Sequence, residues 1–353
     1  MHILLAPDSF KESLSAKQVA DSLKKGFQEA LPNATFDLLP IGDGGEGTMD
    51  TLAGVLDLTE YQTQVTGPFG QPVSVSYYQK DQMAFFEMAS LVGLGSIPAE
   101  KRNPLELETR GIGELILQLV GQGAKTLCVG IGGSATNDGG IGMAAGLGVA
   151  FYDEQGHLLR PVGASIGRVA RIDTSAVPKA LQDIDLQVLT DVTNLLCGSQ
   201  GATYIFGGQK GLNPLLFPSV DQAMQKFYQL VDSRMLTLEG AGAGGGMAAG
   251  LVAFAGGQIT SGIEKSLDLI DFDHKVQTAD LVVVGEGRMD KQSLSTLVPW
   301  NARLTSSKIS TPARVGNAQS SSSMAVPSAA LTAWGISSRF SLTGTSGPNS
   351  WPE

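Results

Sequence analysis

The chain has few cysteines and histidines, the residues that form disulfide bonds and structural zinc sites. It contains 2 cysteines and 3 histidines in 353 residues. Cys128 and Cys197 are too few for a disulfide framework or a structural zinc site. Both lie in or beside apolar runs, so we expect buried thiols. The histidines lie outside every motif described below, and their position disfavours a Ser-His-Asp hydrolase.

Long apolar runs and basic stripes are also missing from the sequence. No run of about 18 apolar residues is present to span a membrane, and residues 1–8 lack the charged n-region of a signal peptide. The net charge is −10, and no basic stripe is present to neutralise a nucleic-acid backbone. We therefore expect a cytoplasmic protein without membrane or nucleic-acid partners. A homodimer is left open.

What the chain has in excess is glycine, with 45 residues. Three loops combine glycines with carboxylates: residues 42–47 (GDGGEG), 132–140 (GGSATNDGG) and 285–290 (GEGRMD). Glycine lets backbone N–H groups converge on a ligand without a Cβ in the way, and converging amides bind phosphate. The carboxylates would repel phosphate unless a divalent cation lies between them. The combination predicts a magnesium–nucleotide site and phosphoryl transfer.

Short apolar runs alternate with periodic segments along the chain. Buried strands are expected at 2–6, 36–41, 127–131, 186–189 and 281–284, and helices at 15–31, 109–120 and 224–231. Ser15 with Gln18 fits a capping box, and Thr109 is expected to cap the second helix. Residues 65–87 predict a hairpin. The alternation predicts an α/β class with parallel sheet, in which ligands lie at the carboxyl ends of strands.

Several motif residues have two interpretations. Asp191 ends a strand, and its carboxylate could act as a general base or bind a metal ion. The alternative is that it caps the next turn. Lys210 lies between glycines and is either a phosphate contact or a solvated side chain. The pair Asp43 and Glu46 forms either a metal site or a tight turn. Glycines 240, 242 and 245 fit G-x-G-x-x-G, but no clear strand precedes them, so helix-packing glycines are favoured over an NAD site.

The chain changes character after Asp290. Residues 291–352 contain no Asp or Glu, hold all three tryptophans and show no convincing helical or strand period. One interpretation is a disordered Ser/Thr-rich tail. The other is that this segment was translated out of frame.

Taken in order, the motifs resemble those of the bacterial type I glycerate kinases. The resemblance rests on residues 6–14, 43–48, 130–140, 191–194, 206–211 and 285–288. It implies phosphorylation of D-glycerate by ATP with Mg²⁺, with 2-phosphoglycerate favoured over 3-phosphoglycerate as the product. It also implies an α/β fold of two domains, a flavodoxin-like parallel-sheet domain with a second α/β domain inserted into it. We place the first domain at 1–64 and 265–295, the inserted domain at 65–264, and an aberrant or poorly ordered tail at 296–353.

The chain departs from the family pattern at three places. Leu195 and Gly208 each stand where the family has proline, and residues 296–299 replace a Gly-Lys-x-Pro motif. A frame shift near residue 295 would explain the last departure, and reading the gene in the neighbouring frame would test it. The altered end also motivates an alternative function, a catalytically impaired relic that still binds nucleotide or ligand.

The expected site residues fall into four groups. Asp191 is expected to orient and deprotonate the glycerate hydroxyl, with Asp8 as the alternate and Lys11 neutralising the transferring oxygens. Expected nucleotide and phosphate contacts are Gly132, Gly133, Ser134, Thr136, Asn137, Lys210, Gly285 and Gly287. Expected substrate contacts are Ser9, Lys11 and Arg288. Expected magnesium ligands are Asp43, Glu46 and Glu286.

Overall fold

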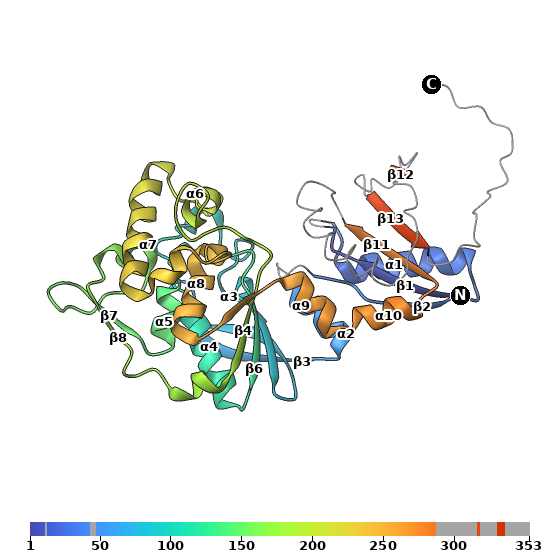
Figure 1. Cartoon of the computed structure of the whole chain (residues 1–353), viewed down its shortest axis with the longest axis horizontal. Helices are drawn as coiled ribbons and strands as arrows, with labels where there is room; N and C mark the ends of the chain where they lie inside the picture. The colour runs from blue at the N-terminus through green and yellow to red at the C-terminus, as the bar shows by residue number, and fades with distance from the viewer. Residues whose placement is uncertain (11–12, 43–46, 287–315, 318–329, 336–353) are drawn as a thin grey trace, which may run out of the picture. The chain divides into compact units, whose positions relative to one another are not determined.

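The computed structural model describes residues 1–10, 13–42, 47–286, 316–317 and 330–335. The chain divides into two compact units, the first made of residues 1–40 and 271–353 and the second of residues 41–270 (Figure 1). The second unit thus interrupts the first, and both contain parallel strands and helices. The predicted α/β class with an inserted unit is confirmed. The predicted boundary between residues 64 and 65 remains a prediction, and it would fall inside strand β3, Thr59–Thr66.

The first unit contains a five-stranded sheet in the order β12-β13-β11-β1-β2. Its elements are β1 (His2–Pro7), α1 (Ala16–Ala30), β2 (Thr35–Leu38), α10 (Phe272–Thr278), β11 (Leu281–Glu286), β12 (Gly316–Asn317) and β13 (Ala330–Gly335). Strand β1 runs parallel to both β2 and β11, and Ile3, Leu5 and Val283 are fully buried against each other. The capping box is confirmed, since Ser15 Oγ accepts from Gln18 N and Gln18 Oε1 accepts from Ser15 N.

Strand β13 lies in the segment where the sequence shows no strand period. It pairs antiparallel with β11 over residues 330–335. The six residues of β13, ALTAWG, show no alternation of apolar and polar side chains that would have predicted a strand. Apart from residues 316–317, the rest of the predicted tail lies outside the described residues. The frame-shift hypothesis concerns the same segment and stays a prediction.

The second unit contains a six-stranded sheet in the order β10-β9-β6-β5-β4-β3. The strands are β3, β4 (Pro72–Lys80), β5 (Met83–Glu87), β6 (Thr126–Gly130), β9 (Asp185–Leu189) and β10 (Gln258–Thr260). A separate small ribbon pairs β7 (Ala150–Tyr152) with β8 (Arg171–Asp173). Strands β3 and β4 form the predicted hairpin, whereas β5, β6, β9 and β10 run parallel.

Helices connect and cover these strands. The α-helices are α2 (Thr48–Leu56), α3 (Ala89–Val92), α4 (Arg110–Gly121), α5 (Ile141–Gly146), α6 (Ala202–Phe206), α7 (Phe217–Val231), α8 (Ala243–Ala255) and α9 (Gly262–Leu269). The 3-10 helices are η1 (Ala99–Lys101), η2 (Gly163–Arg168), η3 (Lys179–Asp183), η4 (Pro214–Leu216) and η5 (Ser233–Leu236). No helix in the described ranges is long and apolar enough to cross a membrane.

The parallel strands bury both faces, as such strands require. Leu127, Val129 and Val188 have no exposed surface and belong to one core cluster with residues of α4 and α8. Cys128 is buried as expected, whereas Cys197 is only partly buried. Burial raises the pKa of each thiol to about 12.

Candidate functional site

Four parallel strands of the second unit end in register at one edge of the sheet. Glu87 pairs with Gly130, Gly130 with Leu189, and Leu189 with Thr260. The residues that follow are therefore neighbours at this edge: the 132–140 loop after β6, Asp191 after β9 and Ser261 after β10. Ligands of open α/β sheets lie at this end of the strands.

The 132–140 loop has an exposed beginning and a buried remainder. Gly133 is exposed, with a left-handed φ of +68°. The amides of Ala135, Asn137 and Gly139 donate to the carbonyls of Val92, Pro104 and Gly245 at 2.8–3.0 Å. The later amides of the loop are therefore used inside the protein, whereas Gly133 is exposed and Gly132 is half-buried.

Asp138 serves the fold from within this loop. Its carboxylate is fully buried and accepts from Gly140 N, Gly142 N and the Thr109 hydroxyl. Burial raises the pKa of Asp138, which these hydrogen bonds partly oppose. This carboxylate caps the start of α5 and is not presented to a cation.

Thr109 has a different role from the one expected. It stands at the N-cap position of α4, but its side chain makes no capping hydrogen bond there. Its hydroxyl instead donates to Asp138 at 2.6 Å and accepts from Met143 N at 2.9 Å. The prediction of a side-chain cap was wrong because a partner 29 residues away competes for the hydroxyl.

Lys210 lies beneath the loop and is 3% exposed. Its Nζ donates to Ser134 Oγ and to Thr136 O, both at 2.8 Å. Burial lowers the pKa of Lys210 to about 7, and the nearby Asp138 carboxylate opposes this shift. The solvated alternative for Lys210 was wrong, because the loop covers the side chain.

The other polar residues predicted in this loop are also buried. Ser134 is 4% exposed, and Thr136 and Asn137 have no exposed surface. Within the described residues, Thr136 Oγ1 and Asn137 Oδ1 have no hydrogen-bond partner. The structure brings Ser134, Thr136, Asn137 and Lys210 together in the interior. They lie beneath Gly132 and Gly133 rather than beside them at the surface.

Gly245, one of the three glycines that fit G-x-G-x-x-G, packs against this loop. Gly244, Gly245 and Gly246, at the start of α8, all have left-handed backbone angles. A Cβ on Gly245 would lie 2.1 Å from Thr136 O. Close packing explains Gly245, and Gly242 is similarly close to another segment, since a Cβ there would lie 2.3 Å from Leu195 O. In the described part of the chain, the element before these glycines is η5 rather than the strand that an NAD site requires.

Asp191 is exposed at the end of β9 and contacts the start of α9. Its carboxylate accepts from Ser261 Oγ at 2.6 Å and from Ile263 N at 3.2 Å. The predicted cap of the next turn is therefore not what the structure shows, because the carboxylate binds the start of α9, 70 residues away, and Val192 N in the next turn donates to Thr190 Oγ1 instead. An exposed carboxylate at this edge can also accept a proton, so the general-base role remains a prediction.

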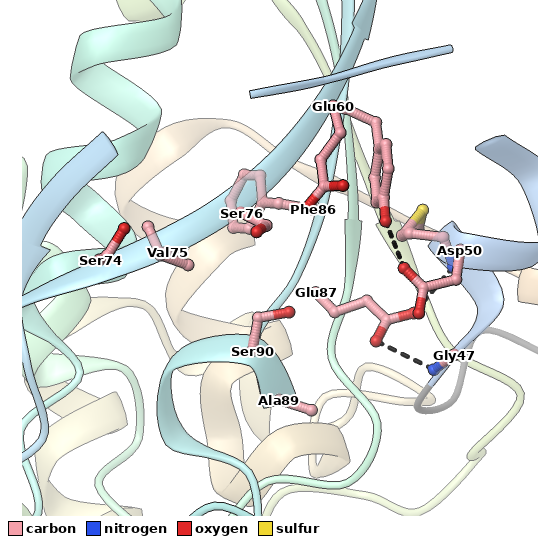
Figure 2. A pocket seen from close by; sticks show the side chains of 12 residues that line it. Gly47, Asp50, Glu60, Ser74, Val75, Ser76, Phe86, Glu87, Ala89 and Ser90 are labelled. Atoms are coloured by element: carbon pink, nitrogen blue, oxygen red, sulfur yellow. Dashed lines mark hydrogen bonds between the residues drawn. The ribbon is translucent and has the colours of Figure 1, made fainter. Parts of the chain in front are cut away.

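A pocket of about 530 Å³ lies between α2, α3 and the β3–β4 hairpin (Figure 2). Its lining includes the carboxylates of Asp50, Glu60 and Glu87 together with several hydroxyls, and it holds no lysine or arginine in the described part of the chain. The Tyr78 hydroxyl donates to Asp50, and burial raises the pKa of Tyr78. A pocket of this charge suits a cation or neutral hydroxyl groups better than an unaccompanied anion.

The sequence analysis did not identify Glu87. This buried carboxylate accepts from Gly47 N at 3.1 Å and Met49 N at 2.8 Å, and it thus fixes the start of α2 directly after residues 43–46 (Figure 2). The amides of Gly47 and Met49 are therefore used by Glu87. An acid at the end of the apolar run 83–86 was the available signal.

In the first unit, Asp8 and Ser9 follow β1 and lie next to the end of β11. Asp8 N donates to Gly285 O at 2.8 Å, and Ser9 N donates to Asp8 Oδ1 at 2.6 Å. Lys11, Asp43, Glu46, Gly287 and Arg288 lie outside the described residues, as does the side chain of Glu286. Among the residues that are described, no group of three or more His, Cys, Asp or Glu could hold a metal ion.

Comparison with known proteins agrees with this arrangement. A model of the glycerate kinase family matches residues 3–347. Glycerate kinase from Neisseria meningitidis serogroup B is 56% identical over 299 residues, covering 85% of this chain and 81% of that protein. Glycerate 2-kinase from Escherichia coli K12 is 41% identical over 305 residues, covering 85% and 80%.

A solved structure shows the same similarity in three dimensions. A crystal structure of a protein described as a glycerate kinase 2, from Salmonella typhimurium LT2, matches with a TM-score of 0.80 and 39% identity, covering 87% of this chain and 84% of that one. The chain therefore belongs to the glycerate kinase family and is an enzyme, a kinase.

Proposed function

We propose that the chain transfers a phosphoryl group from ATP to D-glycerate, with 2-phosphoglycerate favoured over 3-phosphoglycerate. The observation that carries this proposal is the shared edge of β6 and β9, where the glycine loop with its exposed Gly133 and the exposed carboxylate of Asp191 follow neighbouring strands. The family relationship supports the substrate class. A cytoplasmic location and a homodimer stay expectations of the sequence.

Phosphoryl transfer depends mainly on positioning and charge neutralisation. In this proposal the backbone at Gly132 and Gly133 contacts the phosphates of ATP. Asp191 orients and deprotonates the glycerate hydroxyl, since its side chain is exposed and held by Ser261 and Ile263 N. Asp8 is the alternate base. Lys11, Ser9 and Arg288 are proposed to contact the transferring oxygens and the glycerate carboxylate, and Gly285 and Gly287 the nucleotide.

Magnesium fits the carboxylates proposed for it. Mg²⁺ prefers oxygen ligands and usually takes only one or two protein carboxylates beside substrate phosphates, so it does not require a cluster of three acidic side chains. Asp43, Glu46 or Glu286 is proposed to reach the ion, directly or through water. When bound, Mg²⁺ would neutralise charge on the phosphate oxygens.

The experiment that tests this function is phosphorus NMR of the product formed from ATP and D-glycerate by the full chain. A phosphomonoester signal coupled to the C2 proton identifies 2-phosphoglycerate, and coupling to the C3 protons identifies the alternative. If neither signal appears with an active glycerate kinase run in parallel, the proposed function is wrong.

The alternative of an impaired relic is separated by binding measurements. Calorimetric titration with Mg-ATP and with D-glycerate, beside a coupled ADP-release assay, would show binding without turnover if the chain is a relic. High identity to named glycerate kinases over most of the chain does not favour this alternative.

A further inference from the structure

A buried lysine anchors the 132–140 loop to the protein interior next to the exposed Gly133. The Nζ of Lys210 lies 2.8 Å from both Ser134 Oγ and Thr136 O, and the side chain is 3% exposed. We propose, building on the function above, that Lys210 is a positioning residue. It holds the backbone at Gly132 and Gly133 in the shape that the nucleotide phosphates meet, without contacting the nucleotide itself.

The loop needs such an anchor because its own sequence leaves it loose. Gly133, Gly139 and Gly140 have left-handed backbone angles, and glycine loses more conformational freedom on ordering than any other residue. In the part of the chain that the structure describes, Thr136 Oγ1 and Asn137 Oδ1 are buried without partners. The two hydrogen bonds from Lys210 fix the loop on either side of Ala135, next to these unsatisfied atoms.

Lys210 is itself held in a defined place. It follows α6 in a turn where Lys210 N and Leu212 N both donate to Gly207 O. Gly211 has a φ of +91°, and a Cβ there would lie 2.8 Å from Arg102 O. Asn137 Nδ2 donates to Thr203 Oγ1 of α6 at 3.0 Å. The lysine and the loop are therefore joined to α6 at two separate points, which makes α6 a rigid support for both.

The number of hydrogen bonds favours positioning over direct electrostatic contact. Each of the two acceptors needs one N–H, and a neutral amine has two. The anchor therefore persists when Lys210 loses its proton, which burial promotes by lowering its pKa to about 7. A direct contact that neutralised phosphate would instead weaken as the proton is lost.

The other titratable or charged groups near Lys210 leave its positioning role distinguishable from direct electrostatic contact. Asp138 acts on Lys210 through its charge. Tyr228, whose hydroxyl donates to Gly139 O, has a pKa raised far above this range by burial. The Arg102 guanidinium donates to the carbonyls of Leu94 and Ile97.

The test compares wild type, Lys210→Met and the exposed-lysine control Lys226→Met, all as full chains. Amide hydrogen exchange without nucleotide should be faster at residues 134–137 in Lys210→Met by about tenfold or more, as expected for loss of hydrogen bonds that close the loop, and unchanged in Lys226→Met. The Kd for Mg-ATP should rise about tenfold in Lys210→Met. The ratio of the two Kd values should stay constant between pH 7.5 and 9.5.

A double-mutant cycle completes the test. Ser134→Ala removes one acceptor of Lys210, so Lys210→Met in that background should weaken Mg-ATP binding by much less than in wild type. Should Lys210→Met fail to fold, Lys210→Gln takes its place in every arm. Unchanged exchange, additive effects in the cycle, or a Kd ratio that falls toward 1 above pH 7.5 would each overturn the positioning role. If wild type binds no nucleotide, the proposed function fails and this inference fails with it, whereas the other three results overturn the inference alone.

Discussion

The hydroxyl of Thr109 donates to the buried carboxylate of Asp138 at 2.6 Å, and this contact joins the start of α4 to the start of α5. Because the acceptor is a buried carboxylate, losing the donor leaves a charged group with one partner fewer. We expect Thr109→Val to destabilise the protein by about 1–3 kcal/mol, measured by urea unfolding. Thr59→Val, at an exposed strand position, is the control and should stay within about 0.5 kcal/mol of wild type.

The stability contribution of Lys210 should depend on pH with a defined sign. Its pKa is about 7 in the folded protein against an ordinary value of 10.5, so between these values the unfolded chain binds more protons at this site. Stability then rises with pH across this window and is insensitive to this group below pH 7. We expect the stability of Lys210→Met relative to wild type to decrease from pH 7 to pH 9.5, measured from urea midpoints. A constant difference would contradict the lowered pKa.

The Glu87 carboxylate should stabilise the start of α2. It accepts from two backbone amides there, and hydrogen bonds to charged groups contribute about 1.5–3 kcal/mol each. Glu87→Ala should therefore lower the free energy of unfolding by at least about 2 kcal/mol, and Glu87→Gln by less. Glu60→Gln, at an exposed residue of the same pocket, is the matched control. Equal effects from Glu60 and Glu87 substitutions would argue against a specific role for Glu87.

Asp191 has a capping role in the structure and a catalytic role in the proposal, and two variants separate these. Asp191→Asn should lower kcat by roughly 10²–10⁴ if the carboxylate is the general base. Ser261→Ala, which removes the capping partner at 2.6 Å, should cost about 1 kcal/mol of stability and leave kcat within a few-fold. A normal kcat in Asp191→Asn would rule out the general-base role and leave capping of α9 as the only role of this residue.

Two glycine substitutions should change stability in opposite directions. Gly245 has a φ of +72°, and a Cβ would lie 2.1 Å from Thr136 O, so Gly245→Ala should destabilise by about 3 kcal/mol or more. Gly26 lies inside α1 with nothing within 4 Å of an added Cβ, so Gly26→Ala should stabilise by about 0.5–1 kcal/mol. Thermal unfolding of both variants checks the pair.

Local features of the fold could be predicted from the sequence, and features that depend on distant partners could not. The Ser15–Gln18 capping box and the buried strands leave short-range patterns, and both are present in the structure. The burial of Lys210 leaves no such pattern, because its neighbours in sequence are glycines and a glutamine that suggest a surface turn.

The same limit applies to the candidate site. The glycine loop and Asp191 were identified because each follows an apolar run. Glu87 was missed because its importance comes from the register that aligns β5 with β6 and from amides 40 residues earlier in the chain. Which face of a loop is exposed also depends on packing against other segments. Thr136 and Asn137 were therefore expected at the surface, but both are fully buried.

The pairing of Ile3 with Leu281 has a consequence for synthesis on the ribosome. Strand β1 is translated before the second unit, whereas its β11 neighbour follows some 270 positions later, which at about 5–20 residues per second means a wait on the order of 10–50 s. During that wait the second unit has all of its own strands available. We therefore expect the second unit to fold before the sheet of the first unit is complete. In the interval, the apolar β1 segment is expected to bind chaperones.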